Sequence, residues 1–147
     1  MQSLQFERAI SFFSITLSDG TTISLPIVTV TLIQADGNRV SLPLVFDTGA
    51  SVTSLRKDMY ILLGLSSWDV GARVETATGG GEAPVDVYRY EGIVLEVLGK
   101  TLTCPVQLIP MPPNPFYVGL LGRETVFQEF GFGFWESTKQ LYVTSAP

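Results

Sequence analysis

The residue whose type and setting best suit chemistry is an aspartate that directly follows an apolar strand pattern. The run Leu-Val-Phe at 44–46 delivers Asp47, and Thr48 and Gly49 come next. A carboxylate that leaves such a strand needs hydrogen bonds to offset its desolvation, and it can then act as a general acid or base. The two following residues add a hydroxyl, backbone N–H donors and a glycine that lets another backbone approach closely. An ordinary Asx turn, in which Asp47 only organises the local backbone, is the alternative interpretation.

The composition excludes several other kinds of catalytic centre. The 147-residue chain contains no histidine. Within one chain this excludes Ser-His-Asp and Cys-His hydrolysis, His-ligated zinc sites and imidazole proton shuttles. The single cysteine, Cys104, lies in an alternating apolar run, so we expect a buried and inert thiol. The nine Lys and Arg residues are scattered along a chain of net charge −5, and they form no patch for nucleic acid.

The elements that must position Asp47 are mostly strands, because most of the sequence alternates between apolar and polar residues with period two. Turn residues separate these runs into hairpins. Three hairpins are expected, with the strand pairs 28–33 and 40–44, 93–97 and 102–108, and 132–135 and 141–143. The sequence therefore predicts an all-β fold.

Two stretches have helical patterns. One is 55–63, with Ser54 as its N-cap and Gly64 as its C-cap, and the other is 123–130. The proline-rich residues 109–115 must form a stiff loop, because proline fixes φ and cannot donate to a strand ladder. The fold is thus expected to contain one or two short helices.

The length predicts a single domain over residues 1–147, since no repeat or linker divides the chain. The first 15 residues lack a basic start followed by an unbroken apolar stretch, which argues against a signal peptide. No run approaches the roughly 18 apolar residues of a membrane helix. We therefore expect a cytoplasmic protein with no membrane segment, either self-standing or excised from a longer precursor.

Five segments match the pattern of a known family in their order along the chain. They are Asp47-Thr48-Gly49-Ala50-Ser51, Val28-Thr29-Val30-Thr31-Leu32, Thr76-Ala77-Thr78-Gly79-Gly80-Gly81, the strand pair 91–99 and 101–109, and Leu120-Leu121-Gly122-Arg123. The first resembles the active-site loop of aspartic peptidases, especially the short retroviral-like retropepsins. The others resemble that family's early strand, glycine-rich flap tip, paired strands and apolar-apolar-Gly-Arg motif before a short helix. The resemblance covers residues 15–130.

This resemblance implies a closed, barrel-like acid protease fold and a role for each matched residue. Asp47 is expected to be the catalytic acid and base, supported by Thr48, Gly49 and Ala50. Substrate is expected to contact the floor at Ser51 and the flap at Ala77, Thr78, Gly79, Gly80 and Gly81. The glycines also fit a simple hairpin tip with no role in binding.

The sequence departs from the family pattern at several points. Ser51 stands where retroviral members have an acidic residue that faces the substrate backbone, and Glu124 stands where Asp or Asn is common. Residues 1–14 form an N-terminal extension and residues 132–143 a C-terminal hairpin, both beyond the compact retroviral pattern. Ala50 matches the retroviral members, whereas many pepsin-like enzymes have a hydroxyl donor there, so we expect a pH optimum nearer neutrality than that of a digestive pepsin.

The chain has one Asp-Thr-Gly sequence, so the second carboxylate of such a site must come from another copy. A pair of close carboxylates shares a proton, which lets one activate water while the other polarises a carbonyl. The resemblance therefore implies a homodimeric endopeptidase without metal or cofactor, acting in limited processing of protein substrates. A catalytically silent peptide-binding or dimerisation module with the same fold is the alternative.

Overall fold

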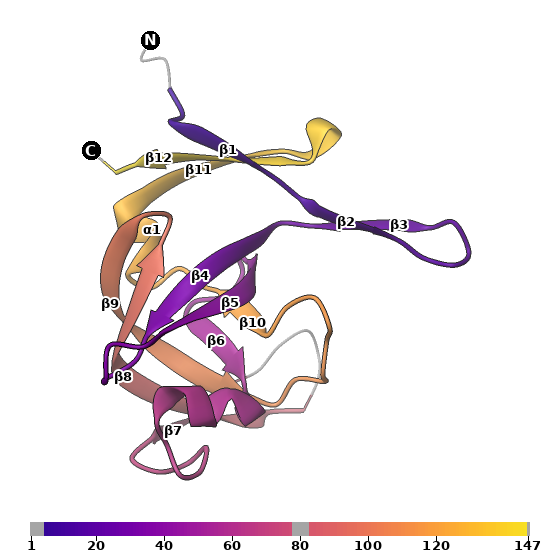
Figure 1. Ribbon diagram of the computed structural model, residues 1–147. Coiled ribbons are helices and arrows are strands. Elements are labelled where there is room, and N and C mark those ends of the chain that lie inside the picture. The colour runs from indigo at the N-terminus through magenta and orange to yellow at the C-terminus, as the bar shows by residue number, and fades with distance from the viewer. Residues whose placement is uncertain (1–4, 78–82, 147) are drawn as a thin grey trace.

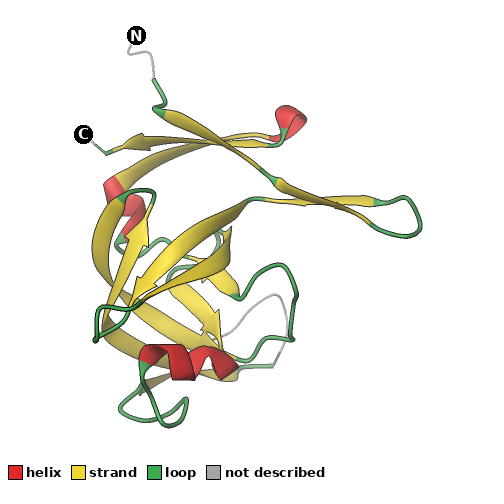
Figure 2. Cartoon of the chain, in the orientation of Figure 1, coloured by secondary structure: helices red, strands yellow, loops and turns green. Residues whose placement is uncertain are grey.

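Strands make up most of the protein, as predicted (Figure 2). The computed structural model describes residues 5–77 and 83–146. The strands are β1 (Arg8–Ser11), β2 (Phe13–Thr16), β3 (Thr22–Leu25), β4 (Ile27–Ile33), β5 (Arg39–Phe46), β6 (Thr53–Arg56), β7 (Arg73–Ala77), β8 (Val85–Val97), β9 (Lys100–Ile109), β10 (Gly119–Leu121), β11 (Phe130–Trp135) and β12 (Gln140–Ser145). The helical elements are the 3-10 helices η1 (Lys57–Leu63) and η2 (Glu136–Thr138) and the short α1 (Val126–Glu129).

Seven strands form the body of the protein in the order β4-β5-β10-β6-β9-β8-β7. Because β4 also pairs with β8, six of them form a ring of hydrogen-bonded strands, with β7 outside it (Figure 1). Alternate side chains of these strands point into one core, as the period-two pattern requires. The fully buried core residues include Val30, Leu44, Val106, Leu108 and Leu121.

The three predicted hairpins are confirmed as β4–β5, β8–β9 and β11–β12. The prolines 110, 112 and 113 lie in a loop after β9, also as predicted. Cys104 is buried in β9, and this burial raises the pKa of its thiol to about 11. The burial that the sequence predicted for Cys104 is therefore confirmed.

Both predicted helices are shorter in the structure than the sequence pattern suggested. Leu55 belongs to β6, where it pairs with Leu108, so η1 begins only at Lys57 and Ser54 caps nothing. Gly64 does end η1, with φ of 75°. The second helix is reduced to α1, because Phe130 pairs with Ser145 at the start of β11. In both places strand pairing takes residues that local propensity assigned to a helix.

Two smaller sheets lie outside the ring. In the first, β12 lies between β1 and β11, so the described ends of the chain lie side by side (Figure 1). In the second, β2 and β3 pair only with each other and project away from the body (Figure 1). The predicted extension, residues 1–14, therefore contains β1 and the start of β2. Within the described ranges, no helix is long and apolar enough to cross a membrane.

Candidate active site

Asp47 leaves the end of β5 and starts a tight turn. Its backbone N–H donates to the carbonyl of Leu121 (3.1 Å), and its Oδ1 accepts a hydrogen bond from the N–H of Gly49 (2.8 Å). The N–H of Ala50 approaches the carbonyl of Asp47 at 3.3 Å. Asp47 is half-buried, whereas Thr48 and Gly49 are exposed. The Asx turn is thus present, and it holds a carboxylate in a fixed orientation beside an exposed hydroxyl.

The loop 47–51 is joined along its length to the segment that follows β10. Arg123 N donates to the carbonyl of Ala50 (3.0 Å), and Glu124 N donates to the carbonyl of Ser51 (2.9 Å). β10 itself lies between β5 and β6, with Gly119 opposite Leu44 on one side and Leu55 on the other. The backbone of the Asp47 loop is therefore hydrogen-bonded at its start and at its end to residues 121–124, a segment far away in the sequence.

Glycine is required where this segment passes β6. A Cβ at Gly122 would lie 2.2 Å from the carbonyl carbon of Val52, and a Cβ at Gly119 would lie 2.0 Å from the carbonyl oxygen of Ser54. The N–H of Gly122 also donates to Thr53 Oγ1 (3.1 Å), a buried hydroxyl. The Gly-Arg motif found in the sequence thus has a local physical reason, which is the close approach of two backbones.

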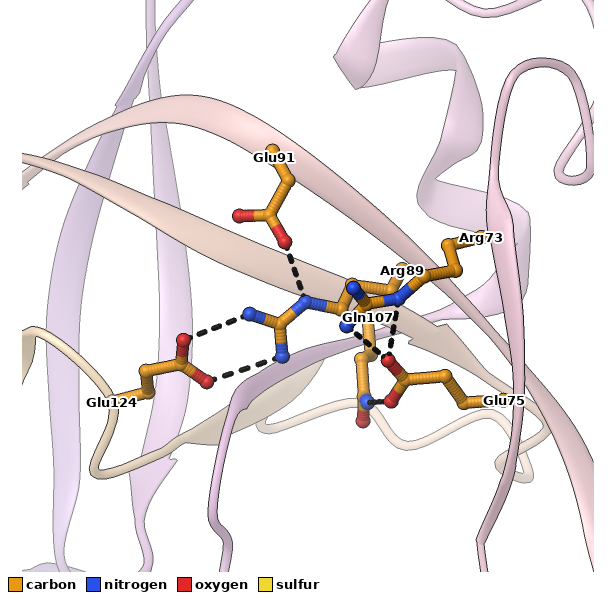
Figure 3. Close-up of polar contacts among 6 residues, drawn as sticks. All are labelled: Arg73, Glu75, Arg89, Glu91, Gln107 and Glu124. Atoms are coloured by element: carbon orange, nitrogen blue, oxygen red, sulfur yellow. Dashed lines mark hydrogen bonds and ion pairs between the residues drawn. The ribbon is translucent and has the colours of Figure 1, made fainter.

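A charged cluster lies beside the same segment and centres on Arg89 of β8 (Figure 3). The Arg89 side chain is only 12% exposed. It donates two hydrogen bonds to Glu124, at 2.8 and 3.1 Å, and one to Glu91 at 2.6 Å. The Arg89 hydrogen bonds hold the pKa of Glu124 below its ordinary value. These two parallel hydrogen bonds fix the position of Glu124, whose N–H donates to the carbonyl of Ser51.

The cluster continues onto β7, where Arg73 pairs with Arg89 across the strands. Arg73 donates to Glu75, which also accepts a hydrogen bond from Gln107 at 3.1 Å (Figure 3). These acidic groups offset the repulsion expected between two arginines directly opposite each other. Side chains thus connect the base of the β7–β8 hairpin to the 121–124 segment.

The motifs that point to Asp47 do not predict that Arg89 lies near the site, although the sequence contains a signal for its pairing. The pattern Arg-x-Glu occurs at 73–75 and again at 89–91. In strands, residues two apart share a face, so each pair could be expected to interact. The contact from Arg89 to Glu124 could not be expected, because it joins residues 35 apart.

We expect Glu124→Gln to lower the free energy of unfolding by about 0.5–1 kcal/mol at neutral pH, since Glu124 is partly solvent-screened. The pKa of the carboxyl is depressed in the folded state, so its stabilising contribution is full above the ordinary value of 4.5. The contribution is lost as the pH falls through the folded value. The difference between wild type and variant should therefore shrink below about pH 4.5.

Denaturant unfolding at pH 7 and pH 3 measures this difference. Glu136→Gln is the matched control, because Glu136 pairs with Lys139 but is 74% exposed. We expect that control to change stability little at either pH. Equal effects of the two variants at pH 7 would show that the Arg89 pair contributes no more than a surface pair.

The structure brings the predicted residues 47–51 together in one loop and places Ala77 at the end of β7, opposite Val85. The other predicted flap residues, Thr78, Gly79, Gly80 and Gly81, lie outside the described residues. In the part of the chain that the structure describes, no hydrogen bond or ion pair joins Ala77 to loop 47–51. The flap assignment stays a prediction.

Two grooves lie elsewhere on the surface. One, of about 650 Å³, lies between η1 and the proline-rich loop and is lined by residues that include Tyr60, Trp68 and Pro112. The other, of about 640 Å³, lies between β4, η1 and β8. Asp47 lines neither of them.

Residues 5–77 and 83–146 contain no group of three or more Cys, Asp or Glu side chains placed to hold a metal ion. No family model and no curated protein matches this chain. The candidate site itself offers one oriented carboxylate, one exposed hydroxyl and the backbone of a glycine turn. Such groups suit acid–base catalysis when a second carboxylate is supplied.

Proposed function

We propose that this protein is an aspartic endopeptidase of the retropepsin type, active as a homodimer. The observation that carries the proposal is the Asp47 loop, which presents one oriented carboxylate on a backbone fixed by the 121–124 segment. One carboxylate cannot both activate water and supply a proton at the same time. A half-buried Asp47 in a single copy fits a site that a second copy completes.

In the proposed mechanism, the two Asp47 side chains lie together on the two-fold axis and share one proton. The ionised member takes a proton from water as the oxygen attacks the peptide carbonyl, and the protonated member donates to the carbonyl oxygen. The C–N bond then breaks as the member that took water's proton gives it to the amine nitrogen. The other member takes back a proton from the hydroxyl formed on the carbonyl oxygen, so the dyad again holds one proton. Thr48, which is exposed beside Asp47, would brace the two loops, and Gly49 would present its backbone to the substrate.

The arrangement of strands supports this assignment. A ring of six strands fits the closed, barrel-like fold of acid proteases. The Gly-Arg motif directly follows β10, which lies between β5 and β6 next to the aspartate loop. β7 ends at Ala77 and pairs with β8, which begins at Val85. The hairpin that these strands form would supply the flap over an extended peptide. Backbone hydrogen bonds would hold that peptide. The proposed role is limited processing of cytoplasmic proteins.

A mass-spectrometric cleavage profile of a diverse peptide library tests the proposal. We expect the cleavage rate per protomer to rise with protein concentration until the dimer is fully formed, because monomers lack the second carboxylate. We also expect a bell-shaped pH dependence whose optimum lies nearer neutrality than pepsin's, since Ala50 supplies no hydroxyl to the dyad. Cleavage that stays proportional to concentration in a demonstrably monomeric sample would overturn the homodimer. A dimeric sample that cleaves nothing would favour the silent binding module.

A further inference from the structure

The β2–β3 hairpin, which we call the arm (residues 13–25), has one apolar face and one hydroxyl face. Its strand register places Phe13 opposite Leu25 and Ile15 opposite Ile23, which puts these four on one face. The other face carries the cross-strand pairs Ser14–Ser24 and Thr16–Thr22, whose hydroxyl oxygens lie 2.8 and 3.2 Å apart. This separation over four consecutive pairs is the pattern of a sheet with one face in water and the other covered.

A single copy of the chain leaves the apolar face of the arm partly uncovered, since Phe13 and Ile23 are exposed while Ile15 and Leu25 are half-buried. The arm projects away from the body (Figure 1), and the exposed fractions of Phe13 and Ile23 are 45% and 39%. At its base, the ring of Phe13 contacts that of Phe116, with centroids 5.7 Å apart. A two-stranded hairpin is at best marginally stable alone in water, so this arm requires a surface to pack against.

The root of the arm indicates which surface that is. Pro26 joins the arm to β4, and its carbonyl accepts a hydrogen bond from the N–H of Phe46 (2.8 Å), the residue directly before Asp47. An arm of this length reaches about 20 Å from its root. If two copies meet at Asp47, each arm therefore starts next to the two-fold axis and is long enough to lie along the partner.

The charge of the arm also fits a second copy of the same chain. Each copy carries a net charge of −5, so two copies repel each other in general. The arm contains a single ionisable side chain, Asp19, in the turn at its tip. Its carboxylate accepts a hydrogen bond from Thr21 N at 2.8 Å, within the same turn. The apolar face itself carries no charge, so a second copy packed against it would not bring like charges together.

We propose that the apolar face of the arm packs against the second copy of this chain, next to the paired Asp47 loops. The choice of partner rests on the proposed homodimeric function. The apolar face would then stabilise the dimer, and the hydroxyl face would stay in water.

Sedimentation equilibrium of the 147-residue chain tests the proposal without any substrate. We expect the double variant Ile15→Thr/Ile23→Thr to raise the dimer dissociation constant at least about a hundredfold, because both arms of the dimer lose buried apolar surface. Threonine keeps the β-branched shape, so the hairpin itself is retained. The matched control is Thr16→Ala/Thr22→Ala on the opposite face, for which we expect a change of less than about threefold.

The outcomes separate this proposal from the proposed peptidase function. An unchanged dissociation constant in the Ile variant overturns the role of the arm, and it does so whether or not the protein cleaves peptides. A weakened dimer in a protein that cleaves nothing supports the arm and counts against the peptidase. A raised KM with an unchanged dissociation constant assigns the apolar face to substrate and overturns the proposal.

A wild type that stays monomeric at every concentration also overturns the role of the arm. A single polypeptide carrying two copies joined by a Gly/Ser linker then tests the peptidase by itself, since the linker supplies the high effective concentration of the second Asp47.

Discussion

Replacing Asp47 by asparagine is expected to lower the rate of peptide cleavage by at least about a thousandfold. Asparagine has nearly the same shape, and its Oδ1 can still accept the hydrogen bond from Gly49 N that orients the side chain. The loop and the dimer should therefore persist, while the group that takes a proton from water is lost. The measurement is kcat on the best library peptide, with circular dichroism and sedimentation to confirm fold and dimer.

A matched control for this variant is Asp36→Asn. Asp36 lies in the β4–β5 turn and accepts a hydrogen bond from Asn38 N (2.9 Å), so it has the same type of Asx turn at a different place. We expect that change to leave kcat within about twofold. Cleavage at the wild-type rate by Asp47→Asn would show that another group is the catalyst.

Mixing the two proteins adds a test of the shared site. Excess Asp47→Asn protein should draw wild-type protomers into mixed dimers, and each mixed dimer would hold a single ionisable carboxylate at its centre. The activity of the wild type should therefore fall as the variant is added. Undiminished activity, with exchange of protomers demonstrated, would contradict a site made by two copies.

The second large effect is expected from Gly122→Ala. A Cβ at this position would lie 2.2, 2.4 and 2.6 Å from backbone atoms of Val52 and Thr53. Backbone atoms cannot move aside as the end of a flexible side chain can, so β10 and the start of β6 must separate. We expect a loss of at least about 3 kcal/mol in the free energy of unfolding, or no folded protein.

Gly20→Ala is the control for this second prediction. Gly20 has φ of 86°, and no atom lies within 4 Å of the position its Cβ would take. Only backbone strain opposes alanine there, and its cost is about 1–2 kcal/mol. Denaturant unfolding followed by circular dichroism compares the two. A Gly122→Ala protein as stable as Gly20→Ala would mean that the two backbones are less closely packed than the structure indicates.

Period-two alternation allowed the hairpins to be predicted, because a strand's pattern and its turn are both local in sequence. The same local information assigned Leu55 to a helix. Local information could not show that Leu55 pairs with Leu108 of β9 and with Gly119 of β10, because both lie more than fifty positions further along the chain. Pairing between distant strands overrode helix propensity there.

Local sequence likewise predicts one part of the candidate site and not the other. Asp47, Thr48 and Gly49 could be predicted because strand, carboxylate and glycine turn are consecutive. The ion pair between Arg89 and Glu124 depends on β8 lying next to the segment after β10. The spacing of residues in the sequence does not show that these segments are neighbours. The arm was equally hard to predict, since the alternation at residues 13–17 does not say that the strand leaves the body.

The placement of β10 between β5 and β6 has a consequence for the order of events during synthesis. The N–H of Gly122 reaches Thr53 across 69 residues of chain, and the carbonyl of Leu121 accepts from Asp47 N. A ribosome that has released the chain only as far as residue 100 has therefore not yet delivered β10, the strand that shapes the aspartate loop. Contacts between such distant residues also form slowly. The aspartate loop of a nascent copy should accordingly reach its final shape only after residues 119–124 have emerged and folded.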